Sequence, residues 1–295
     1  MLRQVLFSSS IFTLVAGSAW AADMDTPLIG NQFYAGPIEE VSGAKPFGGV
    51  AGFLDTYYSR TSSDDTDVNA NSWGLRGSLN AAIGAGVNMQ VDGAISWIDQ
   101  DGGEATQYSG TGHLYYRPQT DYAVGGFAHL SRNDTTIYGL GGSGDAQTKD
   151  YLFGAEAGWF TDQAGFTLQG GLGKTDIDGT EANHVLVGLG MNYFLSDNIR
   201  FDGGLAYHNL NADDLDTKLD IVSLQTVLNY RLDGLPVSIY GGYRLDHVTP
   251  EVSGYRYDGR STNTFLVGVK GHFGSDNLKD EMRNGPIWTN PTLIP

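Results

Sequence analysis

A run of alternating segments between residues 47 and 273 is the feature that most limits the possible folds. In "SWGLRGSLN" (72–80) and "NIRFDGGLAYHN" (198–209), apolar and polar residues take turns along the chain. Successive side chains of a strand point to opposite faces, so a period of two predicts strands with one apolar and one polar face. We count twelve such segments, which start near residues 48, 70, 86, 105, 121, 147, 163, 183, 198, 217, 235 and 260.

The connections between these segments alternate in length. Five are short and six are longer, and most of the longer ones are acidic. The short set is 81–85, 118–120, 161–162, 196–197 and 233–234, and the long set is 61–69, 99–104, 132–148, 176–181, 211–216 and 249–259. An even number of strands, with short turns at one rim and long loops at the other, is typical of a transmembrane β-barrel.

A soluble β-sandwich is the main alternative, because its strands also alternate. The polar positions here are rich in Gly, Ser, Asn, Gln and paired charges, and aromatic residues mark the ends of the apolar faces. Aromatic residues at strand ends are typical of interfacial girdles, and closure satisfies every backbone group in hydrocarbon. The sequence therefore predicts an all-β fold, a transmembrane antiparallel up-and-down β-barrel of twelve strands over residues 47–273.

The first 21 residues have the features of a secretory signal peptide. Arg3 precedes a short apolar stretch, and Ala19 and Ala21 form an A-x-A cleavage pattern. We expect a signal peptide over residues 1–21 and a periplasmic N-terminal segment over residues 22–46, where no clean periodicity is present.

Composition narrows the possible partners. The chain carries 17 basic and 34 acidic residues, a formal charge of −17, which argues against nucleic acid as a partner. It has no cysteine, which fits a chain that crosses an oxidising compartment and folds without disulfides. Its 42 glycines and 9 prolines, with 12% aromatic residues, suit many strands and tight turns rather than disorder.

The chain resembles the outer-membrane β-barrel proteins of Gram-negative bacteria and is broadly porin-like. The resemblance covers residues 47–273 and rests on the alternating strands, the turn and loop asymmetry, and a last strand "FLVGVKGHF" that ends in Phe273. It implies an outer-membrane location, a lipopolysaccharide-containing bilayer, recognition by the barrel-assembly machinery and, in many members, passive transport of small polar solutes. No subfamily is assigned, and the oligomeric state is open.

Charged residues fall on the face of the strands that is expected to line the lumen. A selectivity constriction, in which Arg76, Arg200, Arg231 and Arg244 are opposed by Asp92, Glu156 and Asp202, is one interpretation. A salt-bridged core that merely fills the barrel is the other, and a width of twelve strands does not decide between them. The predicted lumen residues are Asp55, Arg76, Asp92, Arg117, Glu156, Arg200, Asp202, Arg231, Arg244, Asp246 and Lys270.

Two of the acidic loops share the pattern D-x-D-G-x-E. Carboxylates at alternate positions around a glycine turn can converge on a hard cation such as Ca²⁺, although Asp-Gly is also an ordinary hairpin dipeptide. We expect no cofactor apart from possible calcium in these loops, held next to lipopolysaccharide phosphates. The candidate ligands are Asp99, Asp101, Glu104, Asp176, Asp178 and Glu181.

Catalysis is not expected. The chain has six histidines but no G-x-S-x-G, no H-E-x-x-H and no cysteine pair. His208, near the acidic loop 211–216, is the best candidate for an acid–base group at the outer rim. An outer-membrane hydrolase is therefore only the third hypothesis.

The function expected from the sequence is a porin-like channel for small polar or ionic solutes. The alternative is a non-conducting barrel that supports the envelope or binds ligands. The tail, residues 274–295, is expected to be a loose periplasmic end, with a return into the lumen as the alternative, since chain ends are usually disordered unless tied down.

Overall fold

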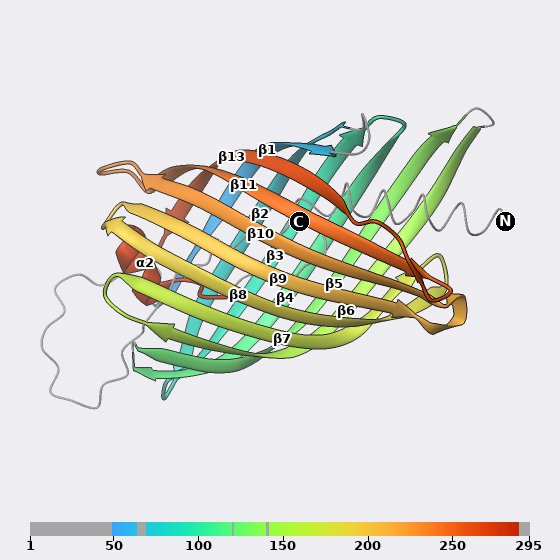
Figure 1. Cartoon of the computed structure of the whole chain (residues 1–295). Coiled ribbons are helices and arrows are strands. Elements are labelled where there is room, and N and C mark those ends of the chain that lie inside the picture. Colours follow the sequence, from blue (N-terminus) through green and yellow to red (C-terminus); the bar gives the residue numbers. More distant parts are fainter. Residues whose placement is uncertain (1–48, 64–68, 120, 140–141, 289–295) are drawn as a thin grey trace, which may run out of the picture.

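Twelve long antiparallel strands close into a single barrel (Figure 1). The computed structural model describes residues 49–63, 69–119, 121–139 and 142–288. The long strands are β1 (Val50–Ser63), β2 (Asn69–Gly84), β3 (Val87–Gln100), β4 (Gly103–Gln119), β5 (Tyr122–Gly139), β6 (Gly142–Phe160), β7 (Ala164–Ile177), β8 (Thr180–Ser196), β9 (Ile199–Ala212), β10 (Thr217–Arg231), β11 (Val237–Val252) and β13 (Arg260–Phe273).

Closure follows from the pairing of the first and last strands. Successive strands pair from β1 to β11, β11 pairs with β13, and β13 returns to β1, where Asp55 lies opposite Lys270. A closed antiparallel sheet leaves no open edge, so all backbone groups of the wall find partners within the sheet. The predicted fold class, strand number and up-and-down order are confirmed.

One end of the barrel, called the short-turn end below, has the tight connections that the sequence predicts. Residues 85–86, 161–163, 197–198 and 232–236 join successive strands there. The predicted signal peptide (1–21) and N-terminal segment (22–46) lie outside the described residues, and no finding bears on them.

At the opposite end, the hairpin end, the strands run further than predicted. The predicted loops 99–104 and 176–181 are paired strand except for the turns Asp101–Gly102 and Asp178–Gly179, and much of 132–148 belongs to β5 and β6. At this end the outward positions become polar or charged, as at Asp99 and Glu104, while inner positions such as Ile98 stay buried. The outward apolar residues that mark a strand in the sequence therefore end before the backbone pairing does.

Two other connections at this end carry short elements. The 3-10 helix η2 (Asp213–Leu215) joins β9 to β10, and the two-residue strand β12 (Tyr255–Arg256) folds back on β11. Most of the predicted loop 61–69 lies outside the described residues, at 64–68.

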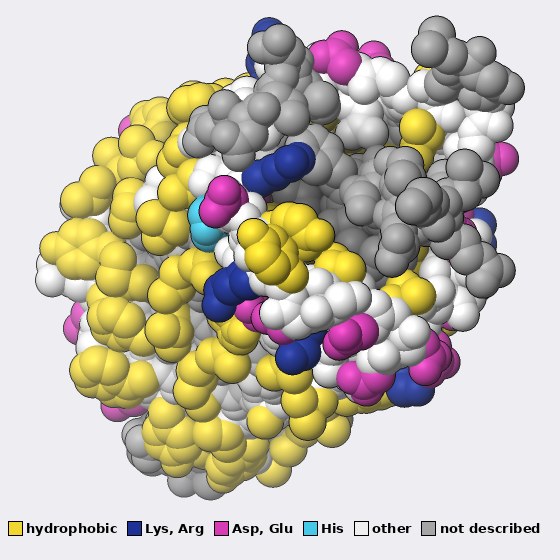
Figure 2. Space-filling view, turned by 45° about the vertical axis from the view of Figure 1, so that its right-hand side comes forward, with side chains coloured by type: hydrophobic (Ala, Val, Ile, Leu, Met, Phe, Trp, Pro, Cys, Tyr) yellow, Lys and Arg dark blue, Asp and Glu magenta, His cyan; other side chains and the backbone are white. Residues whose placement is uncertain are grey.

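The outer wall is apolar and ends in two aromatic girdles. Leucine, valine and phenylalanine side chains of the wall point outward, with Leu172 67% exposed and Phe153 63% exposed. Figure 2 shows hydrophobic side chains over the wall and charged side chains gathered at the rim that faces the viewer. The hairpin-side girdle contains Tyr58, Trp73, Trp97, Tyr108, Tyr151, Tyr207, Tyr243 and Phe265, and the short-turn-side girdle contains Tyr116, Tyr122, Trp159, Phe166, Tyr193, Phe201 and Tyr230.

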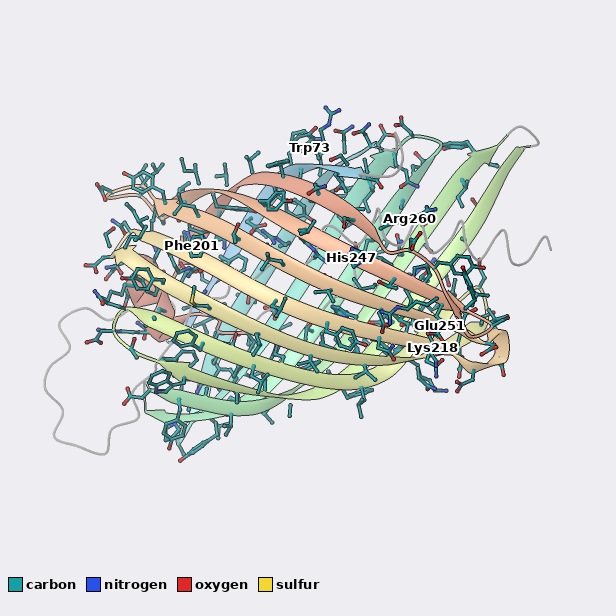
Figure 3. All side chains as sticks on the ribbon, viewed as in Figure 1. Trp73, Phe201, Lys218, His247, Glu251 and Arg260 are labelled. Atoms are coloured by element: carbon teal, nitrogen blue, oxygen red, sulfur yellow. The ribbon has the colours of Figure 1, made fainter. Side chains whose placement is uncertain are left out.

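Figure 3 gives the axial order of these features, with Phe201 toward the short-turn end and the Lys218–Glu251 ion pair at the hairpin end. An apolar wall between two aromatic girdles, around a polar interior, is the inverse of a soluble protein. It is the architecture of an outer-membrane β-barrel.

The chain continues past β13 as an ordered segment that enters the barrel. Helix α2 (Leu278–Asn284) lies in the mouth at the short-turn end (Figure 1), and Ile287 and Trp288 beyond it are buried. The expectation of a loose end is therefore wrong for residues 274–288, called the C-terminal segment below, which return into the mouth of the barrel. Among the described residues no helix is long and apolar enough to cross a membrane.

Candidate functional site: the polar lumen and the C-terminal segment

The structure places all the predicted lumen residues on the inner faces of strands. Their side chains are buried, apart from Arg76, whose side chain is 11% exposed. Period-two alternation was enough to assign these faces, because one apolar wall fixes the direction of every second side chain. The set comprises Asp55, Arg76, Asp92, Arg117, Glu156, Arg200, Asp202, Arg231, Arg244, Asp246 and Lys270.

Two Arg-x-Asp sequences form ion pairs along single strands. On β9, Arg200 Nε lies 2.9 Å from Asp202 Oδ1, and on β11, Arg244 Nη2 lies 2.6 Å from Asp246 Oδ1. Residues two apart share a face of a strand, so each pair forms without a partner strand. Each aspartate also accepts hydrogen bonds from neighbouring strands, for example from Asn229 Nδ2 to Asp202 at 2.8 Å.

A third pair joins β1 to β2 and is surrounded by aromatic rings. Arg76 donates to both oxygens of Asp55, at 3.0 and 2.7 Å, and to Tyr240 Oη at 2.6 Å. Lys270 lies over the ring of Phe53, 4.2 Å from its centroid. Cations over ring faces gain electrostatic attraction when shielded from water.

The predicted opposition of arginines to Asp92 and Glu156 is wrong. Among the described residues, these two acids instead flank His113: its Nε2 lies 2.8 Å from Asp92 Oδ2 and its Nδ1 lies 2.9 Å from Glu156 Oε2. Of the expected opposition, the pair Arg200–Asp202 is formed. Sequence alone could not assign these partners, because they depend on the register between strands.

A second histidine network lies further along the lumen. His184 Nδ1 is 2.8 Å from Asp150 Oδ1, and its Nε2 is 3.1 Å from His208 Nδ1. His208 is therefore buried on the inner face beside another histidine, rather than exposed at the outer rim.

The six proposed calcium ligands lie at the hairpin end, where several of them stabilise turns and strand ends. Asp176 Oδ1 accepts from Gly179 N at 3.0 Å, and Asp178 Oδ1 accepts from Gln147 N at 2.8 Å. Within the described part of the chain, no three His, Cys, Asp or Glu side chains are grouped to hold a metal ion. A calcium site stays a prediction that these contacts do not support. The six are Asp99, Asp101, Glu104, Asp176, Asp178 and Glu181.

Polar contacts anchor the C-terminal segment to the rim of the short-turn end. Arg231 Nη1 donates to Ser275 Oγ at 3.0 Å, and its Nη2 donates to the Ser275 carbonyl at 2.7 Å. Lys279 N donates to the carbonyl of Asp197, in the turn between β8 and β9, at 3.1 Å. Arg231 thus holds the C-terminal segment rather than an acid of the barrel wall.

Glu281 of α2 is a fully buried acid in the mouth at the short-turn end. It contacts His272 and lies 3.9 Å from Arg231 Nη1. Burial raises the pKa of the Glu281 carboxyl, but His272, Arg200 and Lys270 lower it by more, so the pKa lies below its usual value. The carboxylate form therefore stabilises the docked segment.

Gln90, on the inner face of β3, hydrogen-bonds the backbone beyond α2. Gln90 Oε1 accepts from Ile287 N at 2.7 Å and from Trp288 N at 3.0 Å, while its Nε2 donates to the Trp288 carbonyl at 2.8 Å. Gln90 Nε2 also lies 2.9 Å from both carboxylate oxygens of Asp92, which in turn contacts His113. Through Asp92, the side chain that binds the C-terminal segment is thus connected to the histidine network.

An apolar pocket receives the side chains of the C-terminal segment. Trp288 meets Tyr115 edge to face, with ring centroids 5.5 Å apart, and is 1% exposed. The cluster comprises Tyr115, Ala123, Phe160 and Phe194 of the wall together with Leu278, Met282, Ile287 and Trp288 of the segment.

Sequence reasoning missed Gln90, His113 and Glu281 as site residues. The alternation places Gln90 and His113 inward, but the prediction considered ionised groups alone. For Glu281 a signal was present, since "NLKDEMRN" has a capping asparagine followed by two apolar residues, Leu278 and Met282, at helical spacing.

Comparisons with known proteins add little to this geometry. No family model and no curated protein matches the chain. Solved structures that match include the translocator domain of the autotransporter NalP from Neisseria meningitidis (13% identity, 79% of this chain, 90% of that chain, TM-score 0.46). They also include the beta domain of the Bordetella autotransporter Brka (16% identity, 76% of this chain, 99% of that chain, TM-score 0.49) and the KdgM porin (10% identity, 74% of this chain, 99% of that chain, TM-score 0.44). Since these similarities are too low to indicate function, the assignment as an outer-membrane β-barrel rests on the strand pairing, the apolar wall and the polar lumen.

Proposed function

We propose that this protein is a channel in the outer membrane of a Gram-negative bacterium, through which small polar or ionic solutes diffuse. The observation that carries the proposal is the set of arginine–aspartate pairs on the inner wall. Pairs of this kind are an inefficient way to fill a barrel, because apolar residues of similar volume stabilise a protein equally well or better. Ionised groups in a membrane interior are typical of solute pathways.

The mechanism is diffusion past fixed charges, with no covalent step and no catalytic residue. Arg76 with Asp55, Arg200 with Asp202, and Lys270 would set ion preference, as charged rings do in other pores. Insertion by the barrel-assembly machinery and contact with lipopolysaccharide at the hairpin-side girdle belong to the same proposal.

A non-conducting barrel is the second candidate, and the burial of the inner charges favours it. The two functions differ in one measurement, the current through single molecules in a planar bilayer. We expect resolved current steps from the purified protein or from Trp288→Ala, which weakens the C-terminal segment. Stable insertion of both proteins without any current would overturn the channel.

Ion preference tests the role of the wall charges. The reversal potential in a salt gradient should move toward anion exclusion in Lys270→Glu, because the variant replaces an inner positive charge by a negative one. The control is Arg132→Glu, since Arg132 lies outward on β5 at the hairpin end, with its side chain 52% exposed. Equal reversal potentials for both variants would remove Lys270 from the pathway.

A further inference from the structure

The C-terminal segment is held in the short-turn end as a peptide is held in a binding site. Gln90 makes three hydrogen bonds to the backbone of Ile287 and Trp288, two as acceptor and one as donor. A side-chain amide that both accepts and donates imitates the edge of a strand, and such contacts bind an extended backbone whatever its side chains.

Selectivity comes from the pocket beside Gln90. Tyr115, Phe160 and Phe194 supply apolar surface, in a lumen whose other inner positions are mostly polar. An aromatic side chain is the best occupant, because it buries a large apolar area with few rotatable bonds. Trp288 occupies this pocket, and Pro286, two residues earlier, limits the conformations of the free chain.

The attachment is non-covalent and incomplete in one respect. Among the described residues, the buried indole N–H of Trp288 has no hydrogen-bond partner. An unsatisfied buried donor weakens a bound state. The segment is also tethered directly to β13, so it can leave the pocket and return without diffusing away.

We infer that the short-turn end contains a peptide-binding site for a proline-apolar-aromatic segment. The site is formed by Gln90 and the Tyr115–Phe160–Phe194 pocket, and its occupancy closes the channel. Residues 286–288 are the occupant in cis. The inference rests on the proposed function, because closure requires a channel to close.

The first experiment compares single-channel currents of full-length variants. Gln90→Leu has similar size and loses all three backbone hydrogen bonds, so the open fraction should rise at least about tenfold over the wild type. Trp288→Ala should have the same effect. Trp159→Ala is the matched control, since Trp159 lies on the outer wall, 58% exposed, and should leave the open fraction unchanged.

A synthetic peptide of residues 274–288 then tests the site in trans. Added to open Trp288→Ala channels from the short-turn side, it should close them in a saturable manner, and the same peptide with Trp288→Ala should not. Closure by both peptides, or by neither, would overturn the peptide-binding site.

Because the chain has no cysteine, two introduced cysteines can form a single reversible disulfide bond. Asp197→Cys with Lys279→Cys places two thiols where the backbones are hydrogen-bonded at 3.1 Å. Oxidation should hold the channel closed, and reduction should restore openings. Equal currents in oxidised, reduced and Gln90→Leu proteins would overturn closure by the segment but leave the channel intact. No current from any variant would overturn the channel, and closure with it.

Discussion

Removal of the Asp202 carboxylate tests whether the lumen beside the short-turn-side girdle is dry. Asp202 and Arg200 both have fully buried side chains, with 2.9 Å between Arg200 Nε and Asp202 Oδ1. Asp202 also accepts from Asn192 Nδ2 at 2.6 Å and from Asn229 Nδ2 at 2.8 Å. In Asp202→Ala, the guanidinium and two amides lose these acceptors.

The expected cost depends on the surroundings of Arg200. Breaking one partner of a buried pair costs about 3–5 kcal/mol, because the remaining charge is left in a poorly polarisable site. In a water-filled lumen, the guanidinium would be hydrated and the loss would be about 1 kcal/mol or less. With the C-terminal segment docked, both side chains are buried, so the structure predicts the larger value.

Equilibrium unfolding in urea, with the protein in lipid vesicles and followed by tryptophan fluorescence, measures the free energy of unfolding. The double variant Arg200→Leu/Asp202→Leu is the control, because replacing both members by apolar residues should cost much less than removing one. A loss below about 1 kcal/mol in Asp202→Ala would refute the reasoning and indicate water around Arg200.

Three further predictions concern the wall, the C-terminal segment and the acidic loops. Leu189→Arg, between the girdles, should lower the free energy of unfolding by about 2–4 kcal/mol. Leu195→Arg, beside the short-turn rim, should lower it by about 0–1 kcal/mol, because an arginine there reaches water. Equal losses for the two variants would contradict the membrane position. The pKa of Glu281 is lowered by docking, so docking is strongest above the ordinary carboxyl pKa of about 4.3 and weakens as pH falls further. The open fraction should rise on that acidification, and Glu281→Gln should lose this step. The calcium hypothesis predicts that Asp101→Ala/Asp178→Ala reduces the rise in melting temperature caused by Ca²⁺, and an unchanged rise removes it.

Much of the barrel could be predicted from the sequence, because lipid on one side and a polar interior on the other impose a period of two. Trp73 and Arg76 point to opposite sides of β2 for that reason alone. The strand ends could not be predicted the same way. At Asp176 and Glu181 the outward side chains are charged, while the inner residues Ile177 and Ala182 are buried, so the outward apolar signal ends although the backbone remains paired.

The sequence predicts which side chains of the candidate site point inward, but not which of them contact each other. That Asp92 and Glu156 point inward follows from alternation, but their shared partner His113 depends on the stagger of β3, β4 and β6. The position of Trp288 was harder still, since nothing in an isolated polar tail shows which pocket it will enter. Its receptor residues come from strands far apart in the sequence.

The short connection between β13 and the C-terminal segment determines how tightly the pocket must bind the segment. Residues 274–277 alone separate the last strand from α2, so the occupant is always present near its site. A ligand on a short tether has an effective concentration in the millimolar range. A pocket with only millimolar intrinsic affinity would therefore be about half occupied. An open fraction low enough to rise about tenfold on loss of the contacts needs an intrinsic affinity about tenfold tighter than that. A free peptide of similar affinity would need to reach similar concentrations, so dilute peptides would seldom displace the C-terminal segment.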